Sequence, residues 1–144
     1  MRIACAFLLA AYLPLTGCVS AQSPLQRACF HSDEAIEKDV GYCQALRRGN
    51  TLYISGVAGE GSMDLAVRSV YARLGKILTA NALSFANVVK ENVYATDLDV
   101  FIRNREIRKE FYGSALPAAT WVQVQRLYMP SFVVEIELTA EYPR

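Results

Sequence analysis

The sequence predicts an α+β domain in which a mixed β-sheet and two helices form two layers. Residues 64–80 repeat apolar side chains every three or four positions, which indicates an amphipathic helix. Residues 120–127 and 133–140 alternate in polarity with a period of two, which is typical of strands with one buried face. The predicted order along the chain is strand, hairpin, helix, strand, helix, hairpin.

Length and charge narrow the class of protein. The chain has 144 residues, 53% of them hydrophobic, which is enough for one domain with one core. The formal net charge is +1. A nucleic-acid binder of this size normally has a marked basic excess, so we expect no nucleic-acid partner.

The first residues predict export. Arg2 precedes an apolar segment, residues 3–15, that is too short to span a bilayer. The motif Leu15-Thr16-Gly17-Cys18 resembles a bacterial lipobox, in which the cysteine is lipidated and becomes the first residue. We therefore expect a lipoprotein signal peptide over residues 1–17 and a lipid anchor on Cys18.

The residues after Cys18 refine the expected location. Residues 18–26 are predicted to be a tether, followed by one domain over residues 27–144. Val19 resembles the sorting pattern of lipoproteins on the periplasmic side of the outer membrane. As the alternative, small residues in Val19-Ser20-Ala21 also suit ordinary signal peptidase, which would leave a soluble periplasmic protein.

The N-terminal part of the domain is predicted to form an edge strand and a hairpin. Residues 27–31 suit a short strand, and residues 32–39 a charged loop or helical turn. Residues 42–46 and 51–55 alternate around a turn that contains Gly49 and Asn50, both tolerant of positive φ. The glycine-rich residues 56–62 are predicted to be a loop.

Cys29 and Cys43 remain as an even pair after the signal peptide and the anchor are accounted for. In an oxidising compartment they can form a disulfide, and two buried free thiols are an equal alternative. A catalytic thiol is less favoured, because the single histidine, His31, has no evident partners in the sequence that would generate a thiolate.

A strand over residues 88–94 and a helix from Asp97 or Asp99 to about Tyr112 follow the long helix. Both helices have basic residues, which we interpret as solvated faces rather than anion sites. These are Arg68, Arg73 and Lys76 in the first helix, and Arg103, Arg105, Arg108 and Lys109 in the second.

The last two strands are predicted to form a hairpin around Met129-Pro130-Ser131. Because successive side chains point to opposite faces, Glu135 and Glu137 share one face. That face can be buried away from water only if other groups pair with the two carboxylates.

Several short motifs together resemble the Rid superfamily of RidA-like, YjgF/UK-type reactive-intermediate deaminases. The C-terminal part of the pattern is Pro117-Ala118-Ala119-Thr120, Arg126-Leu127 and Val134-Glu135-Ile136-Glu137. The N-terminal and central parts, in the family's order, are Gly41-Tyr42-Cys43-Gln44-Ala45, Gly49-Asn50, Tyr53-Ile54-Ser55-Gly56, Val88-Val89-Lys90 and Asp97-Leu98. The resemblance covers about residues 41–141.

The resemblance implies a chorismate-mutase-like fold and a homotrimer with ligand clefts between subunits. Such an assembly would also cover the sheet face that the helices leave open. The family hydrolyses reactive enamines and imines to keto acids and ammonia, without metal or cofactor. We accordingly expect no cofactor, no metal, and a small molecule in the cleft.

Carried over residue by residue, the family's pocket tyrosine falls on Tyr42 and its water-positioning glutamate on Glu135. The arginine that binds the substrate carboxylate falls on Ala119, whose methyl group cannot form a bidentate charged contact. Trp121 lies beside the expected cleft, where it would stack on a ligand or, more simply, pack in an interface or core. Arg126 would bind an anion or, more simply, pair with Glu135 or Glu137.

Three functions from different classes are compatible with these residues. The first is imine hydrolysis of altered specificity, with Glu135 activating water for a neutral or cationic imine. The second is a periplasmic small-molecule-binding lipoprotein without catalysis. The third is a structural lipoprotein with a vestigial cleft. Fold resemblance cannot choose among them, because function depends on the site.

Overall fold

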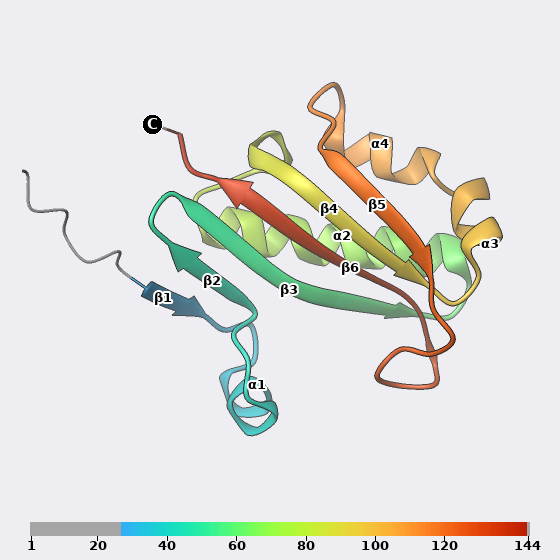
Figure 1. Cartoon of the computed structure of the whole chain (residues 1–144), viewed down its shortest axis with the longest axis horizontal. Helices are drawn as coiled ribbons and strands as arrows, with labels where there is room; N and C mark the ends of the chain where they lie inside the picture. The colour runs from blue at the N-terminus through green and yellow to red at the C-terminus, as the bar shows by residue number, and fades with distance from the viewer. Residues whose placement is uncertain (1–26, 144) are drawn as a thin grey trace, which may run out of the picture.

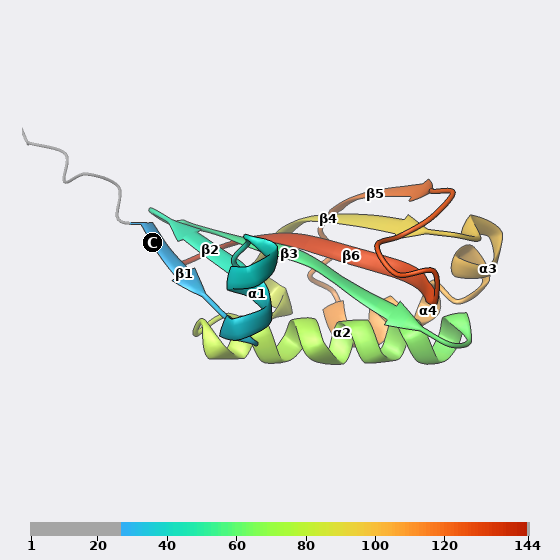
Figure 2. The ribbon, with the colours of Figure 1, turned by 90° about the horizontal axis from the view of Figure 1, so that it is seen from below.

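The structure is a computed structural model, and it describes residues 27–143. The predicted signal peptide (residues 1–17), the anchor at Cys18 and the tether up to residue 26 lie outside the described residues. Six strands form one mixed sheet in the order β1-β2-β3-β6-β4-β5, and helices cover one of its faces (Figures 1 and 2). The predicted two-layer α+β class is confirmed.

The elements follow one another in a simple order. They are β1 (Arg27–Phe30), α1 (Glu34–Val40), β2 (Ala45–Arg48), β3 (Thr51–Glu60), α2 (Met63–Ala80), a 3₁₀ turn (Phe85–Asn87), β4 (Val88–Ala95), α3 (Leu98–Arg103), α4 (Glu106–Tyr112), β5 (Ala118–Gln123) and β6 (Phe132–Glu141). Within the described residues, no helix is long and apolar enough to cross a membrane.

The long helix and the central strand meet along their apolar stripes. Helix α2 runs along one face of the sheet (Figure 2) and buries residues spaced three and four apart, including Val67, Val70 and Leu74. Strand β6 lies between β3 and β4 and buries every second residue from Val134 to Ala140. The buried side chains of α2 and β6 pack together in the core of the domain.

The predicted C-terminal hairpin is wrong. Strand β5 pairs parallel with β4, whereas β6 pairs antiparallel with both β3 and β4. Alternation shows which face of a strand is buried but not which strand lies beside it. The connection from β4 through α3 and α4 to β5 is a crossover, and such connections join parallel strands.

Two further boundaries differ from the sequence expectation, and the helical alternative expected for residues 32–39 is present. The predicted loop 56–62 is largely strand, because β3 continues to Glu60 past a register shift between Ile54 and Val57. The predicted second helix is two helices, α3 and α4, separated at Asn104 and Arg105. Residues 34–40 form a helix, with Asp33 accepting a hydrogen bond from the backbone of Ile36 at its N-terminus.

The open face of the sheet carries both polar and apolar side chains. Across β4 and β6, the pairs Asn92–Glu137 and Tyr94–Glu135 lie opposite each other on this face. Its exposed hydrophobic residues include Tyr53 and Val122. The face is therefore amphipathic rather than an alternation of apolar side chains.

Candidate functional site

A cleft of about 540 Å³ lies beside the C-terminal half of β3, where β2 has ended and the strand edge is open. Segments distant in sequence contribute to it: α1, the residues before β2, β3, α2, the connection before β6, and β6 itself. The lining residues are Ile36, Val40, Tyr42, Gln44, Ser55, Gly56, Val57, Ala58, Arg73, Tyr128, Met129, Phe132 and Glu135. The structure thus brings together two of the predicted site residues, Tyr42 and Glu135.

Glu135 lies on the open face of β6, opposite Ala58 of β3 and Tyr94 of β4. It is half-buried, and its burial raises the pKa of the carboxyl, with the neighbouring charge of Glu137 adding to the effect. Within residues 27–143 no group donates a hydrogen bond to this carboxylate. Its oxygens are therefore available to a ligand or a water molecule.

Gly56 makes room for the side chain of Glu135. A Cβ atom at this position would lie 2.7 Å from Cδ and 2.8 Å from Cγ of Glu135, which is closer than real contacts allow. Any larger residue would displace the carboxylate. The register shift of β3 at the same position brings this glycine under the acid.

Glu137, two residues along β6, has different surroundings. Its Oε1 accepts a hydrogen bond from Nδ2 of Asn92 at 2.7 Å and one from the hydroxyl of Tyr94 at 3.2 Å. The expectation that this polar face supplies partners is met for Glu137 only. Of the two carboxylates that share the face, Glu135 is the one open to chemistry.

Tyr42 enters the cleft from the segment that follows α1. Its backbone N–H donates to the carbonyl of Glu37 at 3.0 Å, and the side chain remains 39% exposed. Partial burial raises the pKa of its phenol, and the negative charges of Glu37, Asp33 and Glu135 add to this. The phenol therefore stays protonated and can donate a hydrogen bond into the cleft.

Arg73 is a cleft residue that the sequence analysis missed. It was predicted to lie on the solvated side of α2, but its guanidinium extends to the open edge of β3 and donates to the carbonyl of Ala58. Burial lowers the pKa of this group, although arginine remains charged at neutral pH. Helical periodicity gives the side of the helix but not the reach of a long side chain, so the sequence contained no clear signal.

Ala119 and Trp121 do not reach this cleft within one chain. Both lie on β5 at the far edge of the sheet, with Ala119 opposite Glu91 of β4. The Trp121 ring packs edge-on against Phe101 at a centroid distance of 5.2 Å, and its Nε1 donates to Glu91 at 3.3 Å. In this chain Trp121 adopts the packing role that the sequence analysis favoured.

Glu91 is a buried carboxylate surrounded by donors. The hydroxyls of Tyr71 and Tyr112 donate to it at 2.8 and 2.7 Å, and Nε of Arg108 donates at 3.1 Å. Arg108 is only 7% exposed, so its prediction as part of a solvated basic face is wrong. The unpaired charge of buried Glu91 would be costly, which explains why a helix arginine turns inward.

Arg126 lies in the connection between β5 and β6 rather than within a strand. Its Nε and Nη2 donate to the carbonyls of Leu127 and Tyr128 at 3.2 and 3.1 Å. It therefore supports the connection and is not bonded to Glu135 or Glu137. The same connection places Tyr128 and Met129 against the cleft, although the sequence analysis treated it as a turn only.

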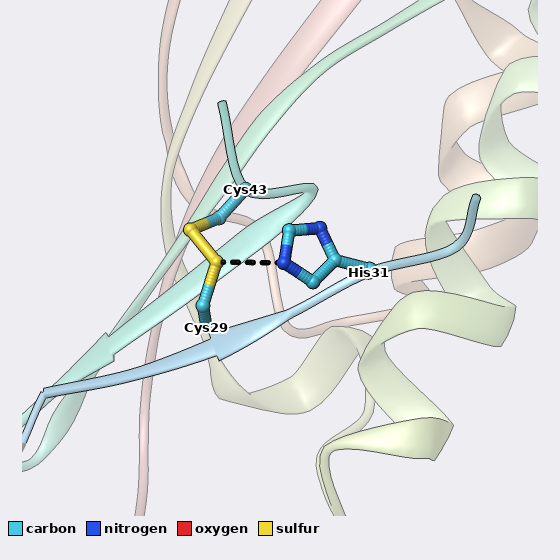
Figure 3. Close-up of side chains that lie close together, drawn as sticks. All are labelled: Cys29, His31 and Cys43. Atoms are coloured by element: carbon cyan, nitrogen blue, oxygen red, sulfur yellow. Dashed lines mark hydrogen bonds between the residues drawn. A yellow bond between two sulfur atoms is a disulfide. The ribbon is translucent and has the colours of Figure 1, made fainter. Parts of the chain in front are cut away.

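Cys29 and Cys43 form a disulfide with a Cα–Cα distance of 5.6 Å, which decides between the two alternatives left open by the sequence. His31 lies beside it, with Nε2 3.3 Å from Sγ of Cys29 (Figure 3). Nδ1 of His31 is 2.7 Å from Oε2 of Glu37, so the statement that His31 lacks partners is wrong. With both sulfurs in the disulfide, this cluster offers a metal ion little beyond the imidazole.

Comparisons with known proteins agree with this fold. The family model described as Endoribonuclease L-PSP matches residues 32–142. A RutC family protein from Pyrococcus horikoshii is 33% identical over 117 residues, covering 74% of this chain and 92% of that protein. The 2-iminobutanoate/2-iminopropanoate deaminase of Mus musculus is 35% identical over 108 residues, covering 69% of this chain and 79% of that protein.

Among solved structures, the crystal structure of a YjgF/YER057c/UK114 family member from Mycobacterium tuberculosis is similar with a TM-score of 0.75 and 28% identity. The similarity covers 81% of this chain and 100% of that chain. The six-stranded arrangement is therefore one that proteins related to this chain also adopt.

Proposed function

This chain belongs to the endoribonuclease L-PSP family, the YjgF/RidA proteins, and we propose that its cleft hydrolyses reactive imines or enamines with altered specificity. The products would be a carbonyl compound and ammonia. A relative of 35% identity that bears the name of an imine deaminase supports the reaction class. The family resemblance seen in the motifs is confirmed.

The observation that carries the proposal is the open carboxylate of Glu135. A half-buried carboxylate whose pKa is raised accepts a proton more readily than an exposed one. In the proposed step, Glu135 takes a proton from water as the water oxygen bonds to the imine carbon. That proton passes to the imine nitrogen and gives a carbinolamine. Glu135 then takes the hydroxyl proton of the carbinolamine and passes it to the amine nitrogen, and the carbonyl forms as the carbon–nitrogen bond breaks and ammonia leaves.

Specificity is proposed to differ because of Ala119. A methyl group there cannot bind a substrate carboxylate, and the cationic side chain among the cleft-lining residues is Arg73. Arg73 enters from α2, whereas Ala119 lies on β5, so a carboxylate held by Arg73 would approach Glu135 from another direction. We therefore expect preferences that differ from those of a deaminase with the arginine on β5.

The cleft is proposed to be completed by other copies of the chain. Tyr42 and Glu135 lie together, but β5 is separated from β6 by β4, so Ala119 reaches such a cleft only from a neighbouring subunit. The exposed Tyr53 and Val122 on the open face give an interface some apolar surface. A homotrimer with inter-subunit clefts remains the expected assembly.

The location is proposed from the sequence alone. A lipid anchor at Cys18 would hold the domain on the periplasmic side of the outer membrane, and cleavage after Ala21 would release it into the periplasm. In either location the protein can act only on imines that are present in the periplasm. The substrate class and the location should therefore be tested together.

The test is ammonia and keto-acid release from freshly generated 2-imino acids with acidic, neutral and basic side chains. The wild type is compared with Glu135→Gln and Ala119→Arg. We expect the wild type to accelerate at least one neutral or basic imine and Glu135→Gln to lose that activity. Activity only in Ala119→Arg would mean that the scaffold can support imine hydrolysis but the natural protein does not catalyse it. Inactivity of all three proteins would favour a binding or structural role.

A further inference from the structure

A second group of reactive side chains lies at the N-terminal end of the domain, apart from Glu135. Cys29 ends up beside Cys43 because β1 pairs with β2 and the chain returns through α1. Cys29 is exposed to solvent and Cys43 is half-buried. The disulfide can therefore be reached by a molecule from outside.

His31 is held in a fixed orientation next to this disulfide. Its Nδ1 contacts the carboxylate of Glu37 at 2.7 Å, which leaves Nε2 directed at Sγ of Cys29, 3.3 Å away (Figure 3). The order sulfur, imidazole, carboxylate is the arrangement that activates a nucleophile: a base within reach, and a third group that orients the base. The disulfide sulfur can only accept a weak hydrogen bond from Nε2–H, whereas the thiol of a reduced Cys29 can donate its proton to Nε2.

Glu37 is itself fixed as an anion. It is 2% exposed, and its Oε1 accepts hydrogen bonds from the backbone N–H groups of Ser32 and Asp33, both at 2.8 Å. The N–H of Gln44 donates to Oε2 at 2.9 Å. Burial alone would raise the pKa of Glu37, but these hydrogen bonds and His31 outweigh it and lower the pKa. A charged Glu37 accepts a hydrogen bond from Nδ1–H of His31 and so fixes the orientation of the imidazole ring.

A second cleft, of about 430 Å³, adjoins His31. Phe30, Val57 and Ile77 give it apolar surface, and Arg73 and Lys76 of α2 line it with two cations. Such a lining suits a small organic anion rather than a peptide segment without charge. The charged groups around His31 are therefore Glu37 and the exposed Glu34 from α1 and these two cations from α2.

We propose that Cys29 and Cys43 form a redox-active pair that exchanges with small disulfides carrying carboxylates, with Cys29 attacking and His31 as its acid–base group. In the dithiol form, His31 accepts the proton of Cys29, and the thiolate attacks one sulfur of the external disulfide. The external sulfur–sulfur bond breaks, and the departing thiolate takes the proton from His31. A mixed disulfide between Cys29 and the other half of the substrate remains.

The second step closes the protein disulfide. The Cys43 sulfur attacks Sγ of Cys29, the mixed disulfide breaks, and the second half of the substrate leaves as a thiol after taking the Cys43 proton. One external disulfide is reduced to two thiols as the two protein thiols are oxidised to one disulfide. The reverse direction oxidises two external thiols and restores the protein thiols.

If the disulfide only cross-links β1 to the segment before β2, Cys29 should show the reactivity of an ordinary thiol after reduction. Such a cross-link needs the two sulfurs at bonding distance but gains nothing from an imidazole aimed at the exposed one. The two accounts therefore differ in the reactivity of Cys29 at a pH below the usual titration range of a thiol, about 8.5.

The experiment uses the full chain, reduced and then freed of reductant, with glutathione disulfide as the probe. Mixed disulfide and protein disulfide are followed by alkylation and mass spectrometry between pH 6 and pH 9. We expect the wild type at pH 6 to react about ten-fold or more faster than His31→Gln, since the thiolate is the attacking species. The ratio of the two rates should decrease toward pH 9, where the Cys29 thiol loses its proton to solvent and does not need His31 as the base.

Two further variants sharpen the result. Cys43→Ser should accumulate the mixed disulfide on Cys29, and Asp39→Asn, an exposed acid of the same helix, should react like the wild type. Because His31→Gln could loosen the N-terminal segment, iodoacetamide is also applied to the reduced wild type at pH 6. We expect Cys29 to be alkylated about ten-fold faster than Cys43. Equal rates of the two thiols, or equal exchange by the wild type and a folded His31→Gln, would overturn the proposal.

Discussion

Glu135 and Glu137 are chemically identical and two residues apart, yet their neighbours give them different roles. Asn92 and Tyr94 bond to Glu137, whereas Glu135 sits over Gly56 without a donor among the described residues. The distinction lies in which partners each carboxylate meets across the sheet. Both residues have a carboxylate that could act as a base, and the side chains that the structure describes leave only that of Glu135 without a hydrogen-bond donor.

The first prediction concerns the titration of Glu135. Its pKa is raised above the ordinary 4.5, so folding favours the protonated form, and that contribution to stability is lost as the pH rises through the raised value. Glu135→Gln should thus raise the melting temperature relative to the wild type at pH 7 and lose most of this advantage at pH 4. Thermal melts at the two pH values measure it.

The same titration should govern activity. If Glu135 is the base, kcat/KM of the wild type rises with pH as the carboxyl ionises, with its midpoint above 4.5. Glu137→Gln is the comparison variant: it should lower stability by weakening the bonds from Asn92 and Tyr94, and it should keep the rising profile of kcat/KM but move its midpoint toward 4.5, because the charge of Glu137 no longer raises the pKa of Glu135. A flat profile in the wild type would count against Glu135 as the base.

Arg73 carries the second prediction, on substrate binding. A charge-assisted hydrogen bond contributes about 1.5–3 kcal/mol, so its loss should cost about ten- to a hundred-fold in kcat/KM. Arg73→Met retains the apolar stem and should lose this factor for 2-imino acids. Arg68→Met, which removes another exposed cation of α2, one that pairs with Glu110 of α4, should leave kcat/KM nearly unchanged. Equal kinetics of both variants would refute the role of Arg73.

At the scale of elements, the connection from β4 to β5 is organised by the buried Glu91. Helix α2 supplies Tyr71, α4 supplies Arg108 and Tyr112, and β5 supplies Trp121 to the same carboxylate. This network ties the helices α2 and α4 to the edge of the sheet. It also fixes β5 beside β4, where an alternating strand pattern alone would have permitted other neighbours.

The third prediction tests that network. Arg108→Leu should lower the free energy of unfolding by about 3 kcal/mol, because it leaves a buried carboxylate without its cation. Urea unfolding followed by circular dichroism measures the loss. Arg105→Leu, at an exposed position immediately before α4, should change stability by less than about 0.5 kcal/mol. Comparable losses of unfolding free energy in the two variants would mean that the ion pair of Arg108 with Glu91 contributes no more to stability than an exposed pair.

At the scale of the whole molecule, the distribution of site residues points to an assembly. In one chain Tyr42, Arg73 and Glu135 line the cleft beside β3, whereas Ala119 lies on β5 at the far edge of the sheet. Mass photometry of the purified protein should give three copies, and cross-linking should join them. A monomer that hydrolyses imines at the full rate would rule out the inter-subunit cleft.

The predicted anchor concerns the whole molecule as well. Labelling of cells with a palmitate analogue should mark the protein, and Cys18→Ala should abolish the label, because the lipobox cysteine is the acceptor. Persistence of the label in Cys18→Ala would exclude Cys18 as the lipidated residue. An unlabelled wild type found free in the periplasm would favour cleavage after Ala21.

The sequence by itself determined what depends on local pattern. The period of α2 and of β6 and the fold class follow from spacing, and the family follows from several short motifs; Tyr42 and Glu135 were candidates because the resemblance to that family implies them. These features are readable because a period specifies which side of an element is buried. The even cysteine pair was visible in the same way, although its pairing was not.

Tertiary structure decided everything that depends on neighbours. The parallel pairing of β5 with β4, the inward turn of Arg108, the reach of Arg73 and the contact of His31 with both Cys29 and Glu37 each join segments distant in sequence. Strand alternation does not encode the adjacent strand, and a cationic side chain on a helix is equally compatible with solvent or a buried acid. The partner, not the residue type, determines its role.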